Sequence, residues 1–164
     1  MSAPIAHTPE DFASANGMKL CYDTFGDRSA PTVMLIMGLG AQMILWDDGF
    51  CGRLAARGFH VVRFDNRDIG RSSRVDVPVK IDFADLIQKQ MKGEKIDSPY
   101  TLRDMAADAT GVLDHLGIKK AHVVGASMGG MIAQDLAMSF PDRLLSLTSV
   151  MSSTGNPMLP PPTP

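Results

Sequence analysis

The sequence predicts an α/β fold in which a mostly parallel, twisted sheet carries helices on both faces. Short apolar runs alternate with longer segments of helical periodicity along the chain. A strand that is followed by a helix and a second strand forms a parallel pair with a right-handed crossover. Ligands of such sheets bind beyond the carboxyl ends of the strands, so chemistry is expected in the loops that leave those ends.

The strand predictions rest on turn residues and on continuous apolar character. A hairpin is expected over Phe12–Ala15 and Met18–Phe25, because Asn16-Gly17 between them is a favoured turn pair. Strands buried on both faces have continuous apolar runs instead of alternation. Such runs predict further strands at Thr32–Met37, Phe59–Phe64, Ala121–Gly125 and Leu144–Met151.

Helices are predicted between these strands. The helices expected at Trp46–Arg57 and Met128–Phe140 are each followed by a residue that ends helices, glycine or proline. A third helix opens at Thr101, where Asp104 completes the pattern of a capping box, and ends at Gly117.

The 164 residues suffice for one domain with a sizeable core. We expect a loose leader at residues 1–9, the folded part over 10–151 and a Pro-rich tail at 152–164. Residues 66–100 have little regular pattern, although a helix over Asp82–Lys92 is one interpretation. The part of this segment at 75–98 either contributes to a site entrance or is surface only.

Composition excludes several classes of protein. An apolar fraction of 45% argues against disorder, and a net charge of −2 offers no basic surface for nucleic acid. The longest apolar run, from Val33 to Trp46, falls short of the roughly 20 residues that cross a membrane. No secretory signal is visible, and Cys21 and Cys51 are expected to be free, so the predicted location is cytoplasmic.

The loop after Ala121–Gly125 has the spacing G-x-S-x-G, with a predicted strand before it and a helix after it. In this context the motif is a nucleophile elbow, a tight turn that lifts the serine hydroxyl above the sheet. Ser127 is therefore the candidate nucleophile, while Gly125 and Gly129 keep side chains from colliding in the turn. A chance match is the alternative, and the strand and helix around the motif disfavour it.

The loop after Thr32–Met37 contains Gly38-Leu39-Gly40 and is the candidate oxyanion loop. The backbone N–H groups of Leu39 and Met128 are the candidate oxyanion donors. A dinucleotide site is the rival interpretation, since these glycines begin G-x-G-x-x-G and Asp65 ends the next strand. Met43 stands where the third glycine would be, which disfavours that site. A plain structural turn is a third interpretation.

The loop that follows Phe59–Phe64 combines two acids, two arginines and a glycine, which predicts a hydrogen-bonded turn. Asp65 lies at a strand end, where a catalytic acid is sometimes found. The favoured interpretation is a structural ion-pair turn, in which Asp65 and Arg67 order the wall of the site.

These motifs together resemble the α/β-hydrolase superfamily, and within it the bacterial aclacinomycin methylesterase-like ester hydrolases. The stretches that carry the resemblance are Met37–Gly40, Asp65–Ser72, Tyr100–Asp104 and His122–Gly130. The family commonly has histidine at the position of Met37, and many members have glycine at that of Asp68. Serine at the elbow disfavours haloalkane dehalogenases and epoxide hydrolases, which use aspartate there.

The resemblance implies a serine hydrolase that cleaves a small-molecule carboxylic ester without a metal or an organic cofactor. Methionines at positions 37 and 128 flank the site, where they either fill the core or suit a substrate with an apolar part. Carbon–carbon bond hydrolysis and cofactor-free perhydrolase activity remain open, because they share the elbow.

The family's chain order is serine, acid, then histidine. No acidic residue follows Asp142, and all of the histidines precede Ser127. Each is expected to be structural or on the surface: His7, His60, His115 and His122. We therefore expect the N-terminal part of a hydrolase, ending after the strand that follows the nucleophile helix, with residues 152–164 as the start of a lid.

Two consequences follow from this expectation. The strand Leu144–Met151 would be an exposed apolar edge, so the chain is expected to self-associate or to pair with a missing C-terminal half. A catalytically inactive half-domain that serves as a binding or assembly partner is the alternative function.

Overall fold

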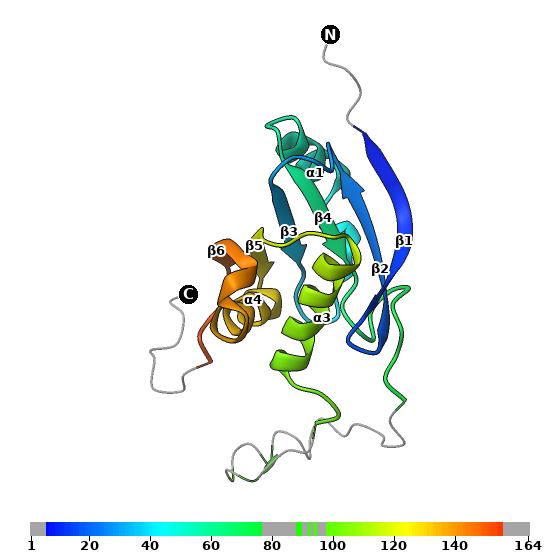
Figure 1. The fold of residues 1–164 in the computed structure, drawn as a ribbon. Coiled ribbons are helices and arrows are strands. Elements are labelled where there is room, and N and C mark those ends of the chain that lie inside the picture. The colour runs from blue at the N-terminus through cyan, green and yellow to red at the C-terminus, as the bar shows by residue number, and fades with distance from the viewer. Residues whose placement is uncertain (1–5, 77–87, 90–91, 93, 95–97, 156–164) are drawn as a thin grey trace.

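The computed structural model describes residues 6–76, 88–89, 92, 94 and 98–155 (Figure 1). The strands are β1 (His7–Ala15), β2 (Met18–Phe25), β3 (Thr32–Ile36), β4 (His60–Phe64), β5 (Ala121–Ala126) and β6 (Leu144–Val150). The helices are α1 (Asp48–Ala55), α3 (Leu102–His115) and α4 (Met128–Ser139), with 3-10 turns at Met43–Leu45 and Pro141–Arg143. None of the helices among the described residues combines the length and apolar character needed to cross a membrane.

The strands form one sheet in the order β1-β2-β4-β3-β5-β6. The pairs β3–β4, β3–β5 and β5–β6 are parallel, whereas β1–β2 and β2–β4 are antiparallel. The predicted α/β class is therefore confirmed, with an antiparallel hairpin added at one edge of a parallel sheet.

Alternate residues of the strands are buried against helices on opposite faces of the sheet. On β3, Met34 and Ile36 belong to the cluster that α3 and α4 cover, while Val33 and Leu35 belong to the cluster under α1. Figure 1 shows the same division, with α3 and α4 on one face and α1 on the other. Because both faces are covered, β3 and β4 consist entirely of buried residues.

The predicted capping box at the start of α3 is confirmed. The N–H of Asp104 donates to the Thr101 hydroxyl at 3.3 Å, and the Thr101 N–H donates to the Asp104 carboxylate at 2.7 Å. The hairpin turn also forms where predicted, with positive φ at both Asn16 and Gly17.

The first strand starts earlier than predicted, so residues 7–9 are part of the sheet and not of a loose leader. His7 pairs with Phe25, stacks on its ring at 4.1 Å, and its Nε2 lies 3.0 Å from the Asp23 carboxylate. The register shifts between Thr8 and Asp11. This irregularity accommodates a proline, which an edge strand tolerates.

The helix predicted over Trp46–Arg57 is shorter, because α1 begins at Asp48. Its N-cap is Asp47, whose carboxylate accepts the Phe50 N–H at 2.9 Å, and aspartate caps helices far better than tryptophan does. The helix considered over Asp82–Lys92 falls largely outside the described residues, as does most of the Pro-rich tail.

Candidate active site

Ser127 occupies the turn between β5 and α4, at the carboxyl edge of the parallel strands. Its backbone has φ of +54° and ψ of −123°, a conformation that costs a non-glycine residue about 1–3 kcal/mol. The Ser127 N–H donates to the Val150 carbonyl of β6 at 2.9 Å, and the Ser127 carbonyl accepts the Gly130 N–H at 2.9 Å. The side chain is exposed, so the strained turn presents the hydroxyl to solvent.

The glycines around Ser127 allow backbone segments to approach one another. A Cβ atom added at Gly125 would lie 2.1 Å from the Gly129 carbonyl oxygen, and one added at Gly129 would lie 2.2 Å from the Ile36 carbonyl oxygen. Any side chain at either position would therefore push α4 away from β5 or β3. The two glycines let the helix begin immediately after the nucleophile candidate.

The candidate oxyanion loop lies beside Ser127. A Cβ atom added at Gly38 would be 3.0 Å from the Ser127 Cβ and 3.4 Å from its Oγ. Leu39 follows and is 79% exposed. Met128 is the first residue of α4, so its N–H is among the helix donors that have no intrahelical acceptor. Leu39 and Met128 thus remain the predicted donors.

Asp65 at the end of β4 binds backbone N–H groups. Its Oδ1 accepts the Met43 N–H at 2.8 Å, and its Oδ2 accepts the Arg71 N–H at 3.2 Å. Gly70 packs so closely that an added Cβ would lie 2.0 Å from Oδ2. These contacts join the buried carboxylate to backbone N–H groups, and among the described residues it forms none of the ion pairs that the favoured interpretation expects.

The ion pair of this loop differs from the expected one, because Arg67 pairs with a residue outside the turn. Its Nε and Nη2 donate to the two carboxylate oxygens of Asp108 on α3, at 2.6 and 2.7 Å. Burial raises the pKa of Asp108, and the hydrogen bonds to Asp108 raise that of Arg67. The Tyr100 ring lies 4.9 Å from the guanidinium. The pair therefore ties the third loop to α3.

Sequence reasoning missed two polar residues that shape this region. Asn66 donates from Nδ2 to the Met37 carbonyl at 2.9 Å, and Asp108 lies 1% exposed within the apolar side of α3. A carboxylate within the buried stripe of a helix is itself a signal of a buried partner. Asn66 had only a weaker signal, its place directly after a strand end.

The histidines lie away from Ser127, and in the described part of the chain no hydrogen bond joins the Ser127 hydroxyl to any of them. His60 begins β4 and is buried, which lowers its pKa. His122, near the start of β5, has its Nδ1 2.8 Å from the Ser146 hydroxyl. Both are at the amino ends of their strands. Over the described residues, no group of His, Cys, Asp or Glu has the arrangement of a metal site.

The cysteines are packed thiols. Both are fully buried, and burial raises the pKa of Cys21 and of Cys51 to about 11. Because the thiolate is the nucleophilic form, these buried thiols of raised pKa are poor nucleophiles.

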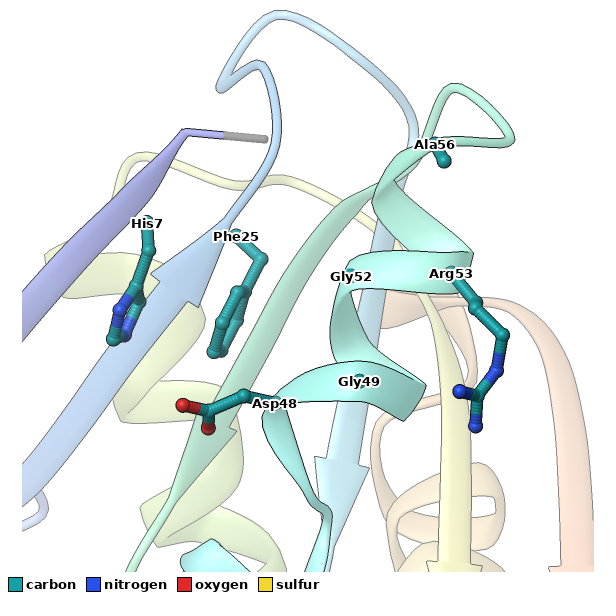
Figure 2. Close-up of a pocket in the computed structure, with 7 residues that line it drawn as sticks. All are labelled: His7, Phe25, Asp48, Gly49, Gly52, Arg53 and Ala56. Carbon is teal, nitrogen blue, oxygen red and sulfur yellow. The ribbon is translucent and has the colours of Figure 1, made fainter. Parts of the chain in front are cut away.

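An open pocket of about 420 Å³ lies on the α1 side of the sheet (Figure 2). Its lining residues are His7, Phe25, Asp48, Gly49, Gly52, Arg53 and Ala56. Phe25 pairs with Val61 near the amino end of β4, whereas Ser127 follows the carboxyl end of β5. The pocket is therefore separate from the elbow.

Comparisons with known proteins agree with this architecture. The model of the alpha/beta hydrolase fold family matches residues 31–164. A rhodomycin D methylesterase of Streptomyces peucetius is 36% identical over 143 residues, which are 87% of this chain and 42% of the relative. A putative carbamate hydrolase of Caulobacter segnis is 34% identical over 133 residues, 80% of this chain and 42% of the relative.

Solved structures share the fold. The enol-lactonase of Burkholderia xenovorans has a TM-score of 0.61 and 29% identity, covering 82% of this chain and 44% of its own. Epoxide hydrolase A of Mycobacterium thermoresistibile has a TM-score of 0.69 and 26% identity, covering 86% of this chain and 38% of its own.

The chain spans about two fifths of the length of the curated relatives, 42% in the methylesterase. The match nevertheless includes the oxyanion-loop segment, the third loop and the elbow, all of which lie within residues 31–164. The chain therefore belongs to the α/β-hydrolase fold family.

Proposed function

We propose that the chain supplies the nucleophile and the oxyanion donors of a cytoplasmic serine hydrolase that cleaves carboxylic esters. The observation that carries this proposal is the placement of Ser127. Its exposed hydroxyl sits on a turn with positive φ at the N-terminus of α4, and the backbone of Gly38 lies beside it. A serine so presented can attack a carbonyl carbon while nearby N–H groups receive the oxygen.

In the proposed reaction, the Ser127 oxygen bonds to the ester carbonyl carbon, and the carbonyl oxygen becomes an oxyanion held by the N–H groups of Leu39 and Met128. Collapse of this intermediate breaks the bond to the alcohol and leaves an acyl group on Ser127. Water then releases the acid. The Ser127 proton passes through a histidine to the leaving alcohol, and that histidine, with its acid, would come from outside this chain.

The proposed substrate is a small-molecule ester with an apolar part. Met37 and Met128 are partly buried beside the elbow, and flexible thioether side chains suit apolar groups. The relatives named as a methylesterase and an enol-lactonase support an ester or lactone. No metal or organic cofactor takes part in this reaction, and no nucleic acid or membrane partner is proposed.

The second candidate is an inactive half-domain that acts as a binding or assembly partner. It is favoured by the histidines, which all precede Ser127, and by the position of His60 and His122 at the amino ends of their strands. Without a general base, only the residual rate enhancement of the oxyanion hole and of binding would remain.

An organophosphate ester probe separates the two candidates. The intact mass of the chain, near 17.7 kDa, should increase by one adduct, and Ser127→Ala should abolish this increase. Free imidazole in the buffer should accelerate labelling, because it can accept the serine proton in place of the missing histidine. Ser14→Ala, at an exposed serine of β1, serves as the matched control and should be labelled like the wild type.

A chain that acquires no adduct even with imidazole would favour the second candidate. An adduct that persists in Ser127→Ala would exclude Ser127 as the nucleophile.

A further inference from the structure

We propose that Asn66 and Asp65 are positioning residues that hold the oxyanion loop, defined here as Met37–Met43, beside Ser127. The inference rests on the proposed function, since the loop matters for catalysis only if Ser127 is acylated. Both residues come directly after β4, the strand adjacent to β3 in the sheet. Two consecutive side chains after β4 thus contact the two ends of the loop that follows β3.

Asn66 holds the beginning of the loop. Its Nδ2 donates to the Met37 carbonyl at 2.9 Å, and the asparagine is only 2% exposed, so water competes little for this bond. In a trans peptide the carbonyl and the following N–H point in opposite directions. By fixing the Met37 carbonyl, Asn66 therefore also fixes the peptide plane between Met37 and Gly38, which directly precedes the peptide that carries the candidate donor, the Leu39 N–H.

Asp65 holds the end of the loop. Its Oδ1 accepts the Met43 N–H at 2.8 Å, and Met43 is 1% exposed. The carboxylate is itself held by the Arg71 N–H at 3.2 Å and by the close packing of Gly70. The second anchor is therefore rigid as well as buried.

Between the anchors the loop is exposed and has little support of its own. Leu39 and Gly40 are exposed, and the hydrogen bond from the Ala41 N–H to the Gly38 carbonyl is long, at 3.3 Å. Oxyanion donors must lie within about 2.7–3.1 Å of the developing charge, and a misplacement of about 1 Å can cost a hundredfold in rate. The distance between this backbone and Ser127 thus depends on the two anchors.

The first test measures amide hydrogen exchange by NMR in the chain itself. In Asn66→Ala the amide of Ala41 should exchange at least tenfold faster than in the wild type, whereas the Met43 amide, which the Asp65 carboxylate holds, should exchange at the wild-type rate. The matched control is Asn16→Ala, which removes another asparagine amide, one that binds the Asp104 carbonyl at 3.1 Å and the Asp108 carboxylate at 3.0 Å. This control should leave both loop amides unchanged. Equal exchange of the Ala41 amide in Asn66→Ala and the wild type would overturn the proposal.

The second test measures the rate at which the organophosphate ester labels Ser127. Asn66→Ala should label about tenfold more slowly than the wild type, the effect of losing one well-placed hydrogen bond. Asn16→Ala should label at the wild-type rate, even if thermal unfolding shows that it loses as much stability as Asn66→Ala. A merely structural role of Asn66 would instead slow labelling equally in the two variants. Unchanged labelling of a folded Asn66→Ala would exclude the positioning role.

The two tests distinguish the inference from the proposed function. A wild-type chain that is never labelled contradicts the proposed function of the chain alone, whereas the exchange rates still decide whether Asn66 anchors the loop. Asn66→Leu, which keeps the approximate size of the side chain and removes the donor without adding a charge, replaces Asn66→Ala if that variant does not fold.

Discussion

At the scale of single residues, Ser127 shows a conflict between stability and function. Its positive φ of 54° disfavours any side chain with a Cβ atom, yet the same turn brings the hydroxyl out to solvent. The surroundings maintain the conformation, through the Val150 carbonyl and through glycines at positions 125 and 129 that admit no side chain. Strain at this point is therefore a cost of presenting the nucleophile candidate.

This strain predicts the order of stability of two variants that both lack the hydroxyl. Ser127→Gly should be more stable than Ser127→Ala by about 1–2 kcal/mol, because glycine adopts positive φ without steric cost. Urea unfolding followed by circular dichroism measures the difference. At Ser14, within β1, the order should reverse, since glycine weakens a strand relative to alanine. Equal stability of the two variants at Ser127 would show that the turn is unstrained.

At the scale of elements, the sequence predicted the helices and strands whose signals lie in residues close together along the chain. Continuous apolar runs identified β3, β4 and β5, and the capping box identified the start of α3. The start of β1 was missed because residues 7–9 are polar or proline, and they join the sheet through contacts such as that of His7 with Asp23. The start of α1 was predicted too early, because helical periodicity does not show which residue caps the helix.

The same distinction applies to the candidate site. The elbow and the glycine loop are local motifs, so Ser127 and Gly38 could be placed from their own segments. The partner of Arg67 could not, because Asp108 is 41 residues away and meets it only when α3 packs on the sheet. Asn66 was missed for a similar reason, since its acceptor belongs to the neighbouring strand's loop.

The link between Arg67 and α3 should be a major contribution to stability. Asp108→Ala leaves a buried guanidinium without its partner and should destabilise the fold by about 3–5 kcal/mol, as measured by urea unfolding. Asp114 on the same helix provides the control, because its bond to Arg143 at 2.7 Å is largely exposed and should contribute under about 1 kcal/mol. A similar small loss in both variants would show that the buried pair does not anchor the loop.

At the scale of the whole molecule, the two edges of the sheet differ in the apolar side chains that they expose. Figure 1 shows β1 at one edge and β6 at the other. On β6 nearly every residue is exposed, including Leu145 at 52%, Leu147 at 39% and Val150 at 37%. An exposed apolar edge is a template for pairing with another strand. The free side of β6 is therefore the part of the described fold best suited to contact a partner.

We expect the chain alone to self-associate through β6 at micromolar concentrations, as sedimentation velocity would show. Leu147→Lys should shift the population toward monomer, because a lysine on an edge strand opposes strand pairing. Leu45→Lys places the same charge at a leucine that is 65% exposed in a 3-10 turn outside the sheet, and it should leave association unchanged. The wild-type chain could instead prove to be a monodisperse monomer that unfolds cooperatively. In that case β6 is stable as a solvent-exposed edge, and neither self-association nor a C-terminal half is required to cover it.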